Sequence, residues 1–336
     1  MRRMSLIPKV LLPGVLMAGV LGVPAAAQAQ RVEGSFQRTL TSGATPEIEV
    51  ETGSGSITVR AGGAGQVEIS GRIQADDRWN RGSLGAEERV RRIEAEPPVQ
   101  QEGNVIRIGR LADEELRRGV SISYTLTVPA GSSLRSNTGS GSQQIEGLTG
   151  GVQAQAGSGS LTFARLGGPL RASTGSGGIA ADGVASLHAT AGSGSIRATG
   201  VSGPIIAKTG SGGIEVTQAG SGDVEVSSGS GRVTLRGVKG ALKASTASGG
   251  LTVQGELAGD WRLSAASGGI DISLPAGQGF QLDADTSSGR IDMGLPVTVV
   301  GTIERRALRG SVHGGGPLLH VRTASGGIRI GAGRQG

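Results

Sequence analysis

The chain has 336 residues, among them 63 glycines but only three Phe, two Trp and one Tyr. It contains no cysteine, which excludes disulfides, a lipoprotein attachment site and thiolate metal sites. The formal charge of +6 falls to +3 (30 minus 27) when the three basic residues of the N-terminal segment are set aside, so the high isoelectric point alone does not indicate an acidic partner.

Residues 1–29 have the pattern of a secretory signal peptide. Three basic residues precede an apolar run of 14 residues, Val10–Val23, and small residues then lead to an expected cleavage after Ala29. The run contains Pro13 and is too short to span a bilayer. We therefore expect an exported protein, periplasmic, on the cell surface or extracellular, with no transmembrane segment after cleavage.

Residues 30–70 contain the first strands, and residues 71–118 interrupt them. In GSGSITVRAGGAGQVEIS, alternation places Ile57/Val59 and Val67/Ile69 inward. The interruption is densely charged, and its SLGAEERVRRIEAEPP stretch predicts a short helix stopped by Pro97-Pro98. We expect this insertion to cap one end of a stack of strands, because an open end would expose strand edges and core.

Residues 119–296 form a regular repeat. The aliphatic residues that follow successive Gly/Ser corners are spaced by 18, 17, 18, 19, 18, 19 and 21 residues. These residues are Leu161, Ile179, Ile196, Ile214, Val233, Leu251, Ile270 and Ile291. A flexible linker has no need of such register, whereas self-similarity at a fixed period predicts a solenoid.

Each repeat contains two short strands with period-2 alternation, such as Leu161/Phe163 and Leu170/Ala172. The expected fold is all-β: a single-stranded parallel β-helix (β-solenoid) of about 18 residues per coil with two main strands per coil. The crossover rule favours a right-handed winding. Residues 30–336 would form one elongated domain, with Phe163, Trp261 and Phe280 filling its thin core.

The Gly/Ser corners are expected to be structural, because glycine allows the chain to reverse and backbones to approach closely. One serine of each corner should stack in a column, where its hydroxyl can satisfy corner backbone groups. The column consists of Ser140, Ser158, Ser176, Ser193, Ser211, Ser230, Ser248, Ser267 and Ser288.

Two further segments depart from the repeat. The later part of the stretch Val120–Gly141, with its VPAG sequence, resembles Ile272–Gly289, with LPAG. Residues 297–336 replace one coil with a hairpin-like excursion before a last corner, and we expect them to form a second cap.

Together, the early coil, the charged interruption, the TLTVPAG strand, the repeated corners and the final GGGPLLHVRTASGGIRI resemble the bacterial putative-adhesin family of β-strand repeats, a family of unknown function. The resemblance covers roughly residues 31–332. It implies a right-handed parallel β-helix at the cell envelope with an adhesive or surface role. The family offers no agreed catalytic residues to carry across.

The sequence contains few patterns that indicate chemistry. No Gly-x-Gly-x-x-Gly or P-loop is present, and the serines lie in Gly-Ser-Gly rather than Gly-x-Ser-x-Gly frames. His188 and His320 are expected to point outward, and neither they nor His313 have ligand partners in the sequence. We expect no cofactor, no metal site and no catalytic residue.

One pair of carboxylates is a candidate. Asp271 and Asp292 each follow the first inward residue of a coil, so we expect them side by side in adjacent rungs. Such a pair can bind a cation or act as a glycosidase pair, although solvated neighbours are the more common case.

The other charged candidates are basic. Arg232, Arg236, Lys239 and Lys243 form a local cluster that would be a solvated face or, less often, a site for an acidic envelope glycan. Arg197 beside Glu215 and Glu225 beside Lys243 should be cross-strand ion pairs. Between Ser136 and Pro296 the outer faces carry 10 basic and 11 acidic residues, so no positive stripe for nucleic acid is expected.

The sequence therefore favours a non-enzymatic envelope protein that acts as an adhesin or binds an envelope polysaccharide or a surface protein. The alternative is an envelope sensor or assembly scaffold that docks a protein partner at the excursion after Val297. A polysaccharide-active enzyme is less favoured, because stacking aromatics are scarce. Neither the ligand nor the oligomeric state is indicated.

Overall fold

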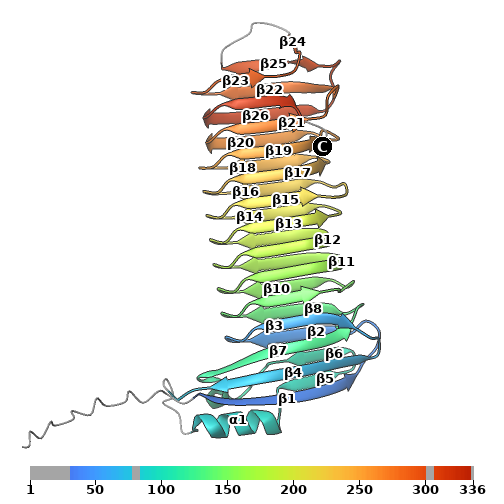
Figure 1. The fold of residues 1–336 in the computed structure, drawn as a ribbon, viewed down its shortest axis with the longest axis vertical. Helices are drawn as coiled ribbons and strands as arrows, with labels where there is room; N and C mark the ends of the chain where they lie inside the picture. The colour runs from blue at the N-terminus through green and yellow to red at the C-terminus, as the bar shows by residue number, and fades with distance from the viewer. Residues whose placement is uncertain (1–30, 78–83, 300–305, 334–336) are drawn as a thin grey trace, which may run out of the picture.

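The structure is a computed structural model that describes residues 31–77, 84–299 and 306–333. The expected signal peptide, residues 1–29, lies outside these residues. The described chain is mostly β-strand, with two small helices, and its strands stack into one long column (Figure 1). The long parallel stacking is consistent with the predicted β-solenoid.

Two stacks of parallel strands form the column, one on each side of the core. β11 (Leu161–Thr174) and β12 (Ile179–Ala191) pass through both stacks, the first half of each in stack A and the second half in stack B. In spatial order, stack A contains β3 (Ile57–Gly62), β9 (Gln143–Glu146), β11, β12, β13 (Ile196–Val201), β15 (Ile214–Gln218), β17 (Val233–Lys239), β19 (Leu251–Glu256), β21 (Ile270–Leu274), β27 (Ile328–Ala332) and β23 (Ile291–Met293).

Stack B contains the second strand of each rung. In spatial order its strands are β2 (Glu47–Thr52), β8 (Ser133–Thr138), β10 (Val152–Ala156), β11, β12, β14 (Ile205–Thr209), β16 (Val224–Ser228), β18 (Leu242–Thr246), β20 (Trp261–Ser267), β26 (Leu318–Ser325) and β22 (Phe280–Thr286).

The register of stack A follows the sequence period. From Leu161 to Ile270, each aliphatic residue after a corner is the direct partner of the next, and all are buried. The core between the stacks is one continuous cluster in which Phe163, Trp261 and Phe280 are fully buried, as predicted. A shift of one residue in any rung would turn its aliphatic side chains outward, so burial fixes the register.

An antiparallel cap covers the N-terminal end. β1 (Val32–Thr41), β4 (Gln66–Ala75) and β7 (Val120–Pro129) extend stack A, and the hairpin of β5 (Val99–Glu102) and β6 (Val105–Ile108) extends stack B. α1 (Ala86–Ala95) lies beneath β1 (Figure 1), and α2 (Glu114–Arg117) precedes β7. Glu94 of α1 accepts a hydrogen bond from the backbone N–H of Ser35 in β1 at 2.8 Å, so the predicted helix satisfies a donor of the first strand.

The expected first coil was wrong in its second strand. Val67 and Ile69 are buried as predicted, but they lie in β4, which runs antiparallel to both β1 and β7. The coil instead consists of β2 and β3, with β2 preceding the Gly-Ser-Gly corner. Alternation fixes which side chains point inward but not the direction of a strand, which explains the error.

At the other end, β24 (Thr298–Val299) and β25 (Ala307–Val312) add antiparallel strands beyond β22. These strands are the described part of the predicted hairpin-like excursion. β25 carries Arg309 opposite Asp283 of β22, and the two side chains form an ion pair at 3.0 Å.

Both ends of the column contain a rung that is out of chain order. After β7 the chain passes over one rung to reach β8, and β2 and β3 occupy that rung. After β21 it again passes over one rung to reach β22, and β26 and β27 occupy it. Both steps occur at Pro-Ala-Gly: Pro129-Ala130-Gly131 and Pro275-Ala276-Gly277.

Candidate functional site

The predicted carboxylate pair is not a pair of neighbours. Asp271 and Asp292 are both register partners of Arg329, whose strand lies between theirs. Arg329 Nη1 is 3.0 Å from Asp271 Oδ1, and its Nε is 3.9 Å from Asp292 Oδ2. The guanidinium neutralises the position that a cation or a glycosidase pair would need, so the expectation of adjacent carboxylates was wrong.

The physical reason is the out-of-order rung. The last strand, β27, has the same inward aliphatic pattern as its neighbours. Sequence spacing alone therefore cannot show which two strands it lies between. Within the described ranges, no three His, Cys, Asp or Glu side chains gather closely enough to hold a metal ion.

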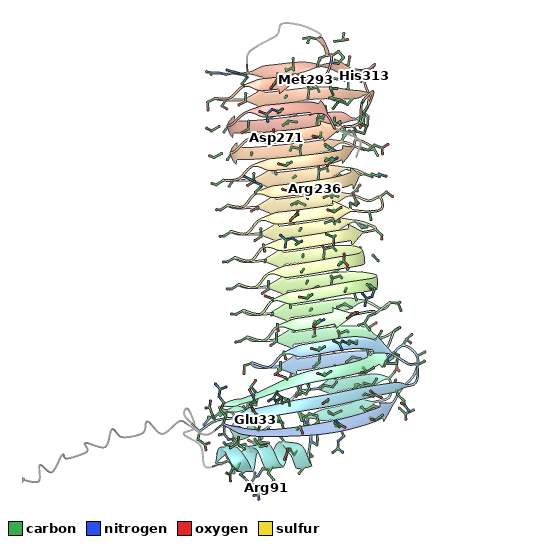
Figure 2. All side chains as sticks on the ribbon, in the orientation of Figure 1. Glu33, Arg91, Arg236, Asp271, Met293 and His313 are labelled. Carbon is green, nitrogen blue, oxygen red and sulfur yellow. The ribbon has the colours of Figure 1, made fainter. Side chains whose placement is uncertain are left out.

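The predicted basic cluster is divided by the fold. Arg236 lies in β17 of stack A, where it pairs with Glu215 at 2.8 Å, whereas Lys243 lies in β18 of stack B. Arg232 is at the exposed corner before β17, and Lys239 ends that strand. Figure 2 shows side chains standing out along the whole column, with Arg236 and Asp271 at different levels. The four residues therefore do not form one patch.

The cross-strand ion pairs are partly as predicted. Arg197 contacts Glu215 at 3.2 Å, and Arg236 contacts it from the next rung. Hydrogen bonds from Arg236 and then Arg197 lower the pKa of Glu215 below its usual range. Glu225 is the register partner of Lys243, but its ion pair at 3.0 Å is with Lys208.

The corner serines are exposed and stack from coil to coil, with the N–H groups of Ser140, Ser158, Ser176 and Ser193 donating to carbonyls of the preceding coil.

Buried hydroxyl groups just before the corners form hydrogen bonds with the corner backbone. Thr209 Oγ1 donates to Gly194 O at 2.8 Å and accepts from Gly212 N at 3.2 Å. The same two bonds are made by Thr138, Thr174 and Ser228. This threonine column was missed by the sequence analysis.

A polar cluster joins the C-terminal cap to the column. Asp283 of β22 contacts Arg309 of β25 and His320 Nδ1 of β26, each at 3.0 Å. Partial burial acts to raise the pKa of Asp283, but hydrogen bonds and charge from Arg309 and His320 outweigh it and lower the pKa. His320 points outward as predicted, and its contact with Asp283 is a consequence of the out-of-order rung.

A depression of about 590 Å³ lies at the N-terminal cap, between the ends of β2 and β8 and the segment before β7. Glu51, Arg110, Arg117 and Asn137 contribute its polar lining, and the Glu51 and Arg110 side chains face each other at 3.8 Å. Tyr124 in its wall is buried, and burial raises the pKa of its phenol far above the usual range. Arg110 offsets the charge of Glu51, and Arg117 adds a second positive charge to the lining.

The outer faces of the two stacks differ in charge. From β8 to β26, the outward residues of stack B include six cations and one anion: Arg135, Arg171, Lys208, Lys243, Arg262, Arg322 and Glu225. From β9 to β27, the outward residues at the register-paired positions of stack A include four cations and five anions: Arg197, Arg236, Lys239, Arg329, Glu146, Asp182, Glu215, Glu256 and Asp271. Between β8 and β26, stack B therefore carries an excess of cations, whereas the strands that flank this range on the same face, β2 and β22, present acidic residues: Glu47, Glu49, Glu51, Asp283 and Asp285.

The stacked parallel strands and their caps place the chain in the class of β-solenoid-like repeat proteins. The family model described as "Toastrack DUF4097" matches residues 125–331, which is more than half of the chain. The protein therefore belongs to the toastrack family, which confirms the family resemblance predicted from its repeats.

Two solved structures are distantly similar. A putative adhesin from Bacteroides fragilis NCTC 9343 has 17% sequence identity and a TM-score of 0.37, with 72% of this chain and 97% of that chain covered. A putative cell adhesion protein from Clostridium sporogenes ATCC 15579 has 10% identity and a TM-score of 0.22, with 89% and 100% covered. No curated protein matches the chain. Among the described residues, no helix is both long and apolar enough to cross a membrane.

Proposed function

We propose that this is an exported, non-enzymatic surface-interaction protein of the cell envelope, with an adhesive role carried by the outer faces of its column. The finer architecture that we propose is a right-handed, single-stranded β-helix with two main strands and about 18 residues per coil. One observation carries the proposal: outward polar side chains remain in register over consecutive rungs of both stacks.

Such faces suit weak contacts that act together. Parallel rungs are about 4.8 Å apart, so a repeating partner can meet an equivalent side chain at each rung or every second rung. Individual exposed contacts are weak, but simultaneous contacts raise the overall affinity strongly. The position of Arg329 between Asp271 and Asp292 also supports a non-catalytic role, because it separates the one carboxylate pair that favoured a polysaccharide-active enzyme.

The experiment is retention of the purified protein on intact bacterial cells, insoluble polysaccharides and an array of envelope glycans, with each supernatant assayed for released sugar. Retention without release is the expected result. Release of sugar that disappears in Asp271→Asn would contradict the non-enzymatic proposal, and retention on none of these surfaces would contradict the adhesive one.

A protein-partner scaffold is the second candidate, favoured by one observation. Among the described strands, β23 pairs with β27 alone, and Ile291 and Met293 are only partly buried. An unpaired strand edge can recruit another strand. Loss of partner capture when Ile291 is changed to Pro, with the column still folded, would favour this role over adhesion.

A further inference from the structure

The outward face of stack B from β8 to β26, here called the basic face, carries a series of basic side chains along the column. Its six cations are Arg135, Arg171, Lys208, Lys243, Arg262 and Arg322. These residues lie on six of its nine successive strands, so neighbouring cations are about 5 to 10 Å apart along the column. All six side chains belong to exposed residues.

Half of these cations form no salt bridge among the described residues, although Lys243 lies opposite Glu225, whose pKa is lowered by Lys208 and, less strongly, by Lys243, and Arg322 lies opposite Asp285. Arg135 pairs with Glu49, Lys208 with Glu225, and Arg262 lies 3.9 Å from Asp260. Within the part of the chain that the structure describes, Arg171, Lys243 and Arg322 form no salt bridge. On stack A, by contrast, Arg197, Arg236 and Arg329 all do. Among the described residues, Lys239 at the end of β17 is a cation of stack A that also forms no salt bridge, so the unmatched positive charge is concentrated on stack B but is not confined to it.

The nearby carboxylates at the corners are already engaged. Asp223 Oδ1 accepts the backbone N–H of Ala241 at 3.2 Å, and Asp260 Oδ1 accepts that of Leu318 at 3.0 Å. Both therefore hold the chain at the start of a rung. Each keeps its negative charge, which offsets part of the positive charge of the basic face, as Asp260 does beside Arg262.

A row of hydroxyls runs beside the cations. Arg135, Arg171, Lys243 and Arg262 share one register position. Two residues further along the strands, a second position presents Lys208 and Arg322 together with the hydroxyls of Ser173, Thr190, Ser227, Ser245 and Ser264. Hydroxyls donate and accept hydrogen bonds, so they match a partner that is itself rich in hydroxyl groups. Aromatic residues that could stack on bases are absent from this face, because Phe163, Trp261 and Phe280 are all in the core.

We propose that the basic face binds an acidic, carboxylate-bearing polysaccharide laid along the column. Cations placed one or two rungs apart meet the repeating carboxylates, and the adjacent hydroxyl row meets the sugar hydroxyls. This inference rests on the surface-binding role proposed above and adds the chemical class of the ligand and the face that binds it. The partner charge follows from complementarity with Arg171, Lys243 and Arg322.

The test compares two variants that each remove three positive charges. The face variant is Arg171→Gln/Lys243→Gln/Arg322→Gln. The matched control is Arg232→Gln/Lys239→Gln/Arg290→Gln, whose residues are equally exposed but lie at corners or strand ends outside the basic face. Thermal unfolding establishes that both remain folded, and affinity electrophoresis in gels containing polygalacturonate measures binding.

We expect the unmodified protein to bind polygalacturonate, with binding that weakens as salt is added. The face variant should bind about 10-fold more weakly, and the control should differ by less than about 3-fold. A neutral galactan should not retard the protein. Equal losses in both variants would overturn the proposal, because they would show a response to net charge alone.

Two outcomes separate this inference from the proposed function. Retention on cells or insoluble glycans without binding to polygalacturonate overturns the acidic-polysaccharide proposal and leaves the adhesive one standing. Retention on nothing overturns both. Tighter binding of a single-stranded DNA oligonucleotide than of polygalacturonate, with the same dependence on the face variant, would assign the face to nucleic acid instead.

Discussion

Asp271 and Asp292 face Arg329 from opposite sides, one rung away in each direction. This relationship exists because the C-terminal strands fill a rung that the chain first passes over. It changes the chemistry of the region, since two carboxylates that spacing would bring together are bridged by a guanidinium group. The positions of these three residues also allow the order of the rungs to be tested directly.

Cysteine cross-links should report the rung order, and the chain has no cysteine of its own to interfere. In Asp271→Cys/Arg329→Cys the two residues are neighbours about 4.8 Å apart, within the range of a disulfide. In Asp271→Cys/Asp292→Cys they are two rungs, about 10 Å, apart. We expect rapid oxidation of the first pair only, measured by peptide mass mapping without reduction. Preferential cross-linking of positions 271 and 292 would instead restore the order expected from the sequence.

Adjacent corner glycines should tolerate alanine very differently. A Cβ at Gly177 would lie 2.0 Å from the carbonyl oxygen of Gly159 in the preceding coil, whereas at Gly178 the nearest atom is 3.5 Å away. We expect Gly177→Ala to lower the free energy of unfolding by about 2 kcal/mol or more, because the stacked backbone must separate. Gly178→Ala is the control and should change it by less than about 1 kcal/mol. Urea unfolding measures both, and similar values would contradict the close stacking of the corners.

The threonine column should contribute through its hydroxyls. Thr209→Val keeps the shape of the side chain but removes the acceptor for Gly212 N and the donor to Gly194 O. We expect a loss of about 1 to 3 kcal/mol of unfolding free energy, because a buried N–H and a buried carbonyl lose their partner. Thr209→Ser keeps the hydroxyl and should lose less. If serine and valine were equally destabilising in urea, the methyl group rather than the hydroxyl would be responsible.

Acid should weaken the attachment of the C-terminal cap. The pKa of Asp283 is lowered in the folded protein, so its contribution to stability is present above the pKa of an unfolded aspartate, about 4, and is lost as the pH falls through the folded value. We expect the melting temperature of the unmodified protein to exceed that of Asp283→Asn at pH 6. The difference should shrink as the pH falls below about 4 and the carboxyl group becomes protonated. A difference that stays constant over this range would show that the charge of Asp283 does not hold the cap.

The repeat and its core were predictable from the sequence, because alternation and period specify which side chains are inward. Every aliphatic residue that follows a corner from Leu161 to Ile270 has the partner that its spacing predicted. The order of the terminal rungs was not predictable in this way, since every rung offers the same apolar edge to its neighbour. The shared Pro-Ala-Gly sequences at Pro129 and Pro275 were noticed as a likeness, and they mark the two places where the chain passes over a rung.

The distribution of charge over the surface could not be predicted by counting charged residues in the sequence. Ten basic and 11 acidic residues in the repeat region indicate balance, but whether a residue lies on stack A or stack B depends on which strand of its coil carries it. Arg171 and Lys243 fall on one face, and Glu215 and Asp271 on the other. The proposed ligand class depends on this separation, which only the three-dimensional register reveals.

Because segments from near both ends of the chain close the column, the strands from β10 to β19 pair with none of the strands that fill the out-of-order rungs. Tandem duplication or deletion of one coil in this middle region would change the length of the molecule by about 4.8 Å while keeping both closures intact. The number of coils can therefore change during evolution while the structures at both ends of the column stay the same. Each added coil would also lengthen both outer faces by one rung, so reach and binding capacity would increase together.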